Sequence, residues 1–443
     1  MKNLFSLVTL VFLVLTVLIG GSSSQALPAN ALLQFLAAIL IGWAIAIKPS
    51  SDDPTCYPSL RWVWLASALL IVFQFLPMPP AFWTRLPGRD GVADGFVLLD
   101  VALPWQTISM SPWASLGSLT WLLPAAALYF AVRSPQGPDL RALARVIVTL
   151  ACASLALGVM QRVTGALYLY RVTNYGLSVG FFANANHHAT FLVCALLFWV
   201  ILYVLPDKRR GLSDAVRSNL FYLIALYLTI GVILCGSLAG TILLVLALVF
   251  AAFLLKPQWL ARRNIRLGLF AFLIAGAAGS VYIGMSTSGF ILDTDMPGMS
   301  RTDFWRNGLS MVLMYFPFGS GLGTFQELYP QFENVDLVGR TYVNHAHNDY
   351  LELLIETGVS GGLLIAAFGA WLVMRIAILR REQTTTALHG LMGVLGLIAL
   401  HSLVDYPLRT AAIAAVFGLT IALSSRPVDP PRSRRGGTAP SER

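Results

Sequence analysis

The chain has 443 residues, of which 57% are hydrophobic and only 12% charged, and its mean hydropathy is +0.72. An ordinary soluble domain carries about 25% charged residues, so this composition excludes that class. The net charge of +9 is compatible with nucleic-acid binding, but the basic residues lie in short clusters between apolar segments. The positive-inside rule for membrane proteins predicts that placement. We therefore predict an all-α polytopic membrane protein.

About 12 transmembrane helices are predicted, each from an apolar stretch of roughly 17 to 25 residues. Residues 218–255 are apolar over nearly twice the length that one crossing requires, and Arg217 and Lys256 flank them. The turn residues 236–240 in the middle indicate a hairpin of two spans. The predicted spans are 4–20, 29–47, 61–77, 119–132, 143–159, 188–205, 219–236, 238–255, 267–284, 350–374, 387–404 and 409–424.

The distribution of charge predicts that both termini are cytoplasmic. With this orientation most of the 30 basic residues, including every lysine, lie on the inner side. The apolar segment after Lys2 could be a cleaved signal peptide, but a retained first helix is preferred. The helical domain is then 1–425, and the basic tail 426–443, rich in Pro, Ser and Gly, is predicted to be disordered and cytoplasmic.

Three outer loops are long, at 78–118, 160–187 and 285–349. The first contains Trp83, Trp105 and Trp113, which fit anchors at the membrane surface, with sugar stacking as the alternative. Because the other outer loops are tight turns, these three are expected to carry the chemistry.

The second outer loop ends in a polar segment at the start of the sixth span. Asn184, Asn186 and His187 lie there, and they could either cap the helix or contact a ligand. Arg162 and Arg171 in the same loop could bind an anion.

The third loop, 285–349, is predicted to be the main outer loop and the functional centre. Arg301 and Trp305 precede the glycine-rich segment 317–325. A Gly-x-Gly-x-Gly run is similar to a phosphate cradle, but it does not follow a strand in a βαβ unit. A tight turn is the favoured interpretation.

Residues 345–358 are the most informative stretch, since two histidines and three carboxylates lie at the start of the predicted tenth span. Ionisable groups in that position are costly and usually mark a site. Asp349, Glu352 and Glu356 are spaced by three and four residues and therefore share one helix face. The deepest of them, Glu356, is expected to be structural. The outer turn 405–409 adds an acid and a cation on the same side.

The sequence His347-Asn348, nine residues, Gly358, two residues, Gly361 resembles the signature of bacterial O-antigen ligases and related polysaccharide polymerases. The resemblance extends over about 180–410. Further similarities are Arg301 with Trp305 ahead of Pro-Phe-Gly-x-Gly-x-Gly, and the Phe-x-x-Asn-x-Asn stretch at 182–186.

The resemblance implies a GT-C-like fold and a metal-independent, inverting glycosyltransferase without a cofactor. It would act on the periplasmic face of the bacterial inner membrane, in lipopolysaccharide or exopolysaccharide biosynthesis. The donor would be a glycan on undecaprenyl diphosphate. The acceptor would be lipid A–core for a ligase, or a lipid-linked glycan for a polymerase, and the sequence does not separate the two.

Histidine suits a base near neutral pH, and arginine suits a developing diphosphate charge. His347 is therefore expected to activate or orient the acceptor, and Arg301 to clamp the diphosphate. The expected substrate-binding residues are Arg171, Asn184, Asn186, His187, His345, Asn348 and Arg409.

One position departs from the family pattern. Members commonly carry a Ser-Arg-Gly or Ser-Arg-Ala turn whose arginine contacts the diphosphate, and the corresponding turn here is 237–240, with Leu238 in place of arginine. Another outer arginine could substitute, activity could be reduced, or the substrate could differ.

Two alternatives of other classes stay open. His345-x-His347-x-Asp349 has the alternation of a metallo-hydrolase site. Twelve spans are also a common number for transporters of a glycan or another solute, although no two-fold repeat is evident.

Overall fold

The computed structural model describes most of the chain, and the described residues are 2–24, 28–47, 66–67, 69–206, 213–255, 301–337, 343–381 and 386–425, with isolated helical positions 268, 271, 275 and 278. Most of the predicted spans 61–77 and 267–284, the first part of the loop 285–349, and the tail 426–443 lie outside these residues. The predictions for those segments stay predictions.

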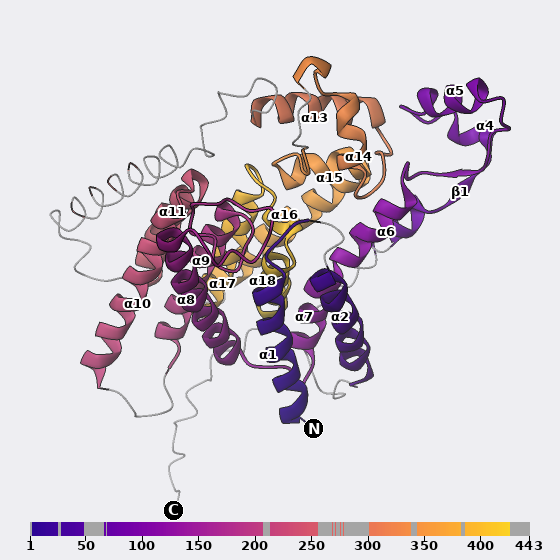
Figure 1. The fold of residues 1–443 in the computed structure, drawn as a ribbon. Coiled ribbons are helices and arrows are strands. Elements are labelled where there is room, and N and C mark those ends of the chain that lie inside the picture. The colour runs from indigo at the N-terminus through magenta and orange to yellow at the C-terminus, as the bar shows by residue number, and fades with distance from the viewer. Residues whose placement is uncertain are drawn as a thin grey trace, which may run out of the picture.

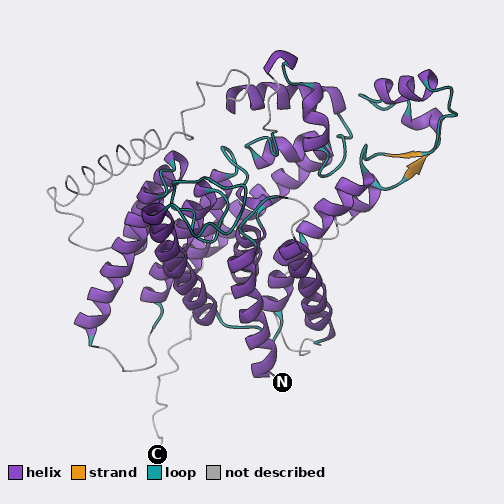
Figure 2. Cartoon of the chain, in the orientation of Figure 1, coloured by secondary structure: helices purple, strands orange, loops and turns teal. Residues whose placement is uncertain are grey.

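The regular secondary structure of the described residues is almost entirely helical, so the all-α prediction is confirmed (Figure 2). The strands are a short antiparallel pair, β1 (Pro77–Met78) and β2 (Gln106–Thr107). The longer helices are α1 (Lys2–Ile19), α2 (Pro28–Ala46), α6 (Pro112–Trp121), α7 (Leu123–Arg133), α8 (Leu140–Thr164), α9 (Ala185–Val204), α10 (Asp214–Leu234), α11 (Leu238–Leu255), α13 (Arg301–Tyr315), α16 (Val359–Arg381), α17 (Thr386–His401) and α18 (Ala411–Ser424). Shorter helices are α4 (Pro80–Trp83), α5 (Asp90–Leu98), α14 (Phe325–Leu328), α15 (Asp349–Thr357), η2 (Tyr329–Gln331), η3 (Val335–Leu337) and η4 (Pro407–Arg409).

Seven segments of the described chain are helices long and apolar enough to cross a membrane, and three shorter apolar helices accompany them. Each of these ten corresponds to one predicted span, so the multi-pass architecture is confirmed. The hairpin predicted within 218–255 is present, since α10 and α11 are separate helices joined by a turn at Cys235–Ser237.

Helix α9 is the centre of the bundle. It packs against α8, α10, α11 and α17 (Figure 1). A helix that is apolar on all sides is stable only when it is surrounded, and α9 has buried residues on every face along most of its length. Its first turn differs from the rest of the helix because it is polar, and it carries Asn186 and His187 into the same buried environment.

The first helix is part of the packed core. Phe5, Leu13 and Val17 are fully buried, and α1 packs against α2, α7, α8 and α18. The chain that follows passes close to the loop before α9, since a Cβ on Gly21 would lie 2.2 Å from the carbonyl oxygen of Phe181. The retention of this helix stays a prediction.

The predicted tenth span, 350–374, begins too early. Residues 349–357 form the separate short helix α15, and the membrane-length helix α16 starts only at Val359. Gly358 divides them with a φ of +60°, a conformation that favours glycine. The three carboxylates of α15 therefore do not enter the apolar span, which avoids the cost of burying them in hydrocarbon.

A second hydrophobic core lies at the end of the bundle opposite the N-terminus, where α13, α14 and α15 come together (Figure 1). We call residues 301–337 and 343–357 the outer lobe. Its buried core residues are Phe304, Met311, Tyr315, Phe325, Leu328, Tyr329, Val343, Ala346 and Ile355.

The glycine-rich segment 317–325 is a tight turn packed against the end of α15. The amides of Ser320 and Gly321 donate to the carbonyl oxygens of Ile355 and Glu356, at 3.0 and 2.9 Å. These amides are already used inside the protein, so the turn does not form a phosphate cradle. A Cβ at Gly319 would lie 2.5 Å from the carbonyl group of Glu356, which explains the small residue.

Substituting Gly319 by alanine is expected to destabilise the outer lobe. Its φ of +79° disfavours a side chain, and the added Cβ meets backbone that cannot move aside. A left-handed residue costs about 1–2 kcal/mol and overpacking about 1–3 kcal/mol, so we expect a loss of about 2–4 kcal/mol. Thermal unfolding in detergent measures it. Gly95→Ala in α5, where no atom lies within 4 Å, is the matched control, and equal melting temperatures for the two variants would contradict the prediction.

Candidate active site

The site begins with the loop 343–348 and the cap of α15 that ends it. The side-chain oxygen of Asn348 accepts from the amides of Tyr350 and Leu351, both at 3.0 Å, and its Nδ2 donates to the carbonyl oxygen of Leu403 at 2.9 Å. Asn348 was expected to bind substrate. The structure instead uses both ends of its side chain to start α15 directly after His347 and to fasten it to the bundle.

The carboxylate of Glu352 fixes the path of the loop 343–348. Nδ1 of His345 donates to its Oε1 at 2.9 Å, and the amide of Ala346 donates to its Oε2 at 2.9 Å. The next residue, His347, has a φ of +50°. Residues other than glycine rarely adopt this region, and they keep it only where their surroundings hold them there. His347 is thus held in one backbone conformation between Glu352 and the Asn348 cap.

Asp405, in the turn between α17 and α18, is fully buried, and three imidazoles lie close to its carboxylate. Its carboxylate oxygens lie 3.8 Å from His187 Nε2, 3.6 Å from His347 Nδ1 and 3.7 Å from His401 Nε2. Nδ2 of Asn186 donates to Oδ2 of Asp405 at 2.7 Å. The bundle supplies Asn186, His187 and His401, whereas the outer lobe supplies His347.

Two aromatic rings complete the surroundings of His347. The ring of Phe304 lies nearly parallel to the imidazole, with the centroids 5.3 Å apart and an interplanar angle of 16°. Tyr406 meets the imidazole edge-on at 4.9 Å. The side chain of His347 is 23% exposed, against 1% for His187 and 0% for His401. His347 is therefore the imidazole around Asp405 that a substrate can reach.

Asp405 is an anion in this arrangement. Burial alone would raise its pKa, but the neighbouring imidazoles of His187, His347 and His401 outweigh burial and hold the pKa well below the usual range of aspartate. A carboxylate at Nδ1 keeps the opposite nitrogen, Nε2, as the basic one and stabilises the imidazolium that forms when it accepts a proton. The pair can act as a general base.

Arg409 lies among the three carboxylates of α15. Its guanidinium nitrogens are 3.7 Å from Asp349, 3.4 Å from Glu352 and 3.2 Å from Glu356. Burial would lower the pKa of this guanidinium, but the carboxylates raise it, so Arg409 stays charged. Arg409 was expected to bind substrate. Its contacts show that it holds α15 against the turn 405–409, and the expectation of a structural Glu356 agrees with this geometry.

One positive charge does not balance three carboxylates in a buried place. Burial raises the pKa of Asp349 to about 7, against the opposing charge of Arg409. Burial and the neighbouring Glu352 raise that of Glu356 to about 7. For Glu352, burial is outweighed by Arg409 and His345, which lower its pKa to about 2. Near neutral pH the negative charge is therefore concentrated on Glu352, the residue that holds the loop.

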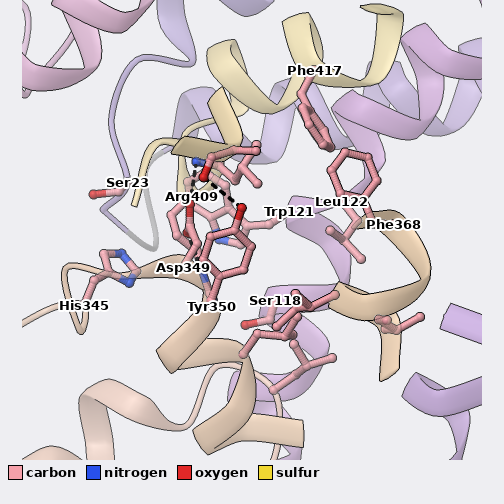
Figure 3. Close-up of a pocket in the computed structure, with 16 residues that line it drawn as sticks. Ser23, Ser118, Trp121, Leu122, His345, Asp349, Tyr350, Phe368, Arg409 and Phe417 are labelled. Atoms are coloured by element: carbon pink, nitrogen blue, oxygen red, sulfur yellow. Dashed lines mark hydrogen bonds and ion pairs between the residues drawn. The ribbon is translucent and has the colours of Figure 1, made fainter. Parts of the chain in front are cut away.

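A cavity of about 280 Å³ opens beside this cluster (Figure 3). Its polar lining includes His345, Asp349 and Arg409. The rest of the lining is largely apolar and comes from the span helices, including Trp121, Leu122, Ile365, Phe368 and Phe417. Such a cavity suits an amphiphile, with a polar group at the outer lobe and a hydrocarbon part between the helices.

The remaining predicted site residues have different positions. Asn184 is the N-cap of α9, where its side chain accepts from the amide of Asn186 at 2.8 Å, and it also hydrogen-bonds Tyr406. Arg171 is exposed in the loop before α9. Arg301 is the first residue of α13, one turn before Phe304 on the helix, and its side chain lies outside the described part of the structure.

The sequence placed the acid of the turn 405–409 on the same side as the histidine segment, but it did not assign Asp405, His401, Tyr406 or Phe304 to the site. A signal existed for the first two, since a histidine on an apolar helix four residues before an aspartate shares one face with it. Nothing in the sequence indicated that this face meets a loop more than fifty residues earlier.

The side chains of the metallo-hydrolase alternative, His345, His347 and Asp349, do not converge on one point. His345 bonds Glu352, His347 faces Asp405, and the Asp349 carboxylate accepts from the hydroxyl of Ser402 at 2.8 Å. Within the described ranges, no group of three or more histidine, cysteine or acidic residues has an arrangement that could hold a metal ion. The geometry does not favour that alternative.

Comparison with known proteins gives one family. Residues 223–366 match the family model described as O-antigen ligase. No curated protein sequence gives a significant match to the chain. The matched segment includes the second half of α10, all of α11, α13 and α15, and with them His347, while Asp405 follows it in the sequence.

The stability of the protein is expected to fall as the pH rises from about 4 to about 7. In this window the folded protein keeps protons on Asp349 and Glu356 that the unfolded chain releases, so it binds more protons than the unfolded state. Glu356→Gln cannot ionise and should reduce the fall. Melting temperatures in detergent at pH 5 and pH 8 measure it.

Glu327→Gln, on the exposed side of α14, is the control and should keep the pH dependence of the wild type. If Glu356→Gln loses as much stability between the two pH values as the wild type does, the raised pKa of Glu356 is wrong.

Proposed function

We propose that this chain, in which residues 223–366 match the O-antigen ligase family model, transfers a glycan from undecaprenyl diphosphate to a lipid A–core or lipid-linked glycan acceptor. The reaction takes place at the outer lobe, on the periplasmic face of the bacterial inner membrane. The observation that carries the proposal is the partly exposed His347 with Nδ1 facing the buried carboxylate of Asp405.

His347 acts as the general base. Its Nε2 accepts the proton of an acceptor hydroxyl while the oxygen forms a bond to the anomeric carbon of the donor. The bond between that carbon and the diphosphate oxygen breaks on the opposite face, which inverts the configuration, and the diphosphate leaves with the electron pair. The anionic Asp405 stabilises the imidazolium, and a positioned base of this kind contributes about 10²–10⁴-fold.

The diphosphate needs positive charge as it leaves. Arg409 is already paired with three carboxylates, so it is not the clamp. Arg301 lies one helical turn before Phe304, whose ring contacts His347, and we assign the clamp to Arg301. At the start of α11, Leu238 stands where an arginine was expected, and the exposed Arg171 is the candidate for a second phosphate contact.

The cavity beside Arg409 supports a lipid-linked donor. Its apolar wall comes from α6, α16, α17 and α18, so a chain entering it passes between span helices. A cavity of about 280 Å³ holds only the first isoprene units next to the diphosphate, and the remainder of the carrier stays in the bilayer. A transporter would instead place its polar groups near the middle of the spans, whereas here they gather at one end.

The substitution His347→Ala is expected to lower the rate of glycan transfer by about 10²-fold or more, because no base is left to accept the proton of the acceptor hydroxyl. Transfer is measured with membranes or proteoliposomes that contain the purified protein, a lipid-linked donor and an acceptor. Gel filtration in detergent checks that the variant is folded. Retained transfer would refute the role of His347.

The matched control is His389→Ala. His389 lies near the start of α17, whereas His401, which faces Asp405, is the last residue of the same helix. The control should retain transfer, and a loss equal to that of His347→Ala would indicate a general effect of removing a histidine.

Deletion of the gene distinguishes a ligase from a polymerase. Long chains that remain on the lipid carrier and are absent from the core indicate a ligase. Single repeat units attached to the core, without long chains, indicate a polymerase.

A further inference from the structure

The ring of Phe304 covers the face of the proposed base. Phe304 is 5% exposed and belongs to the core of the outer lobe, yet its ring lies parallel to the imidazole of His347 at 5.3 Å and not only against other apolar groups. The edge of Tyr329 contacts it, with the centroids 6.1 Å apart. Phe304 therefore links the lobe core to His347.

His347 is held from several directions, and each contact restricts a different motion. Asp405 faces Nδ1, Tyr406 meets the ring edge-on, and Phe304 lies parallel to the imidazole plane. The carboxylate comes from the bundle and the phenyl ring from the lobe. Without Phe304, the imidazole could rotate about its side-chain bonds away from Asp405.

The stacked ring also affects the charged form of the base. When Nε2 accepts the acceptor proton, the imidazole becomes a cation in contact with the negative face of an aromatic ring. A cation in this position is attracted by the ring quadrupole, whereas a leucine of similar size offers only volume.

We propose that Phe304 is a positioning residue for the transfer reaction, which holds the imidazole of His347 against Asp405 and stabilises the imidazolium formed in the transition state. This inference rests on the proposed function. It assigns to α13 a part in catalysis through Phe304, separate from the diphosphate contact assigned to Arg301.

The test compares Phe304→Leu with Phe304→Tyr at saturating acceptor. Leucine fills the site without a ring face, and tyrosine restores the ring. Aromatic and cation–π contacts of this kind correspond to about threefold to tenfold in rate, so Phe304→Leu should lower kcat by that factor with the donor KM unchanged. Phe304→Tyr should recover most of the lost rate.

Met311→Leu is the matched control, since Met311 lies in the same lobe core and has no ring contact with His347. The inference is overturned if Phe304→Leu has the wild-type kcat, if its loss appears in KM alone, or if Phe304→Tyr is as slow as Phe304→Leu. In a His347→Ala background the leucine substitution should cause no further loss of rate.

The failure of this inference is distinguishable from the failure of the proposed function. If His347→Ala keeps transfer activity, the proposed function is wrong. If His347→Ala is inactive and Phe304→Leu is as fast as the wild type, only the role of Phe304 is wrong.

Discussion

The buried carboxylate of Asp405 is the interaction on which the site depends. Burying an unpaired charge is expensive, so the protein around it must supply partners. Asn186 and His187 at the start of α9 and His401 at the end of α17 do so from the bundle, and His347 does so from the outer lobe. The same carboxylate that faces His347 thus also holds the lobe against the bundle.

The sequence predicts the bundle well and the site only in part. Apolar length and charge distribution are local properties, which is why α8 and the α10–α11 hairpin agree with the predicted spans. The break between α15 and α16 was missed, since it depends on Gly358 packing against the turn at Pro317. His347 was identifiable from its motif and polar setting, whereas Asp405 required the contact between two distant segments.

The contacts of Asn348 and Arg409 illustrate a general difficulty. Both are polar residues at a membrane surface next to a predicted base, and sequence alone favours substrate binding for each. In the structure both are saturated by intramolecular partners, Asn348 by the first amides of α15 and Arg409 by carboxylates. Burial and pairing are set by tertiary packing, so they cannot be read from residue type or spacing.

The break at Gly358 has a mechanical consequence. A membrane helix adapts to a thicker or thinner bilayer by tilting, and a continuous helix would carry that tilt to any residue at its end. Here α16 begins directly after Gly358, and α15 is attached separately to the glycine-rich turn and to Arg409. The direction of α15, and with it the position of His347 beside Asp405, is therefore set by these packing contacts and not by continuity with α16.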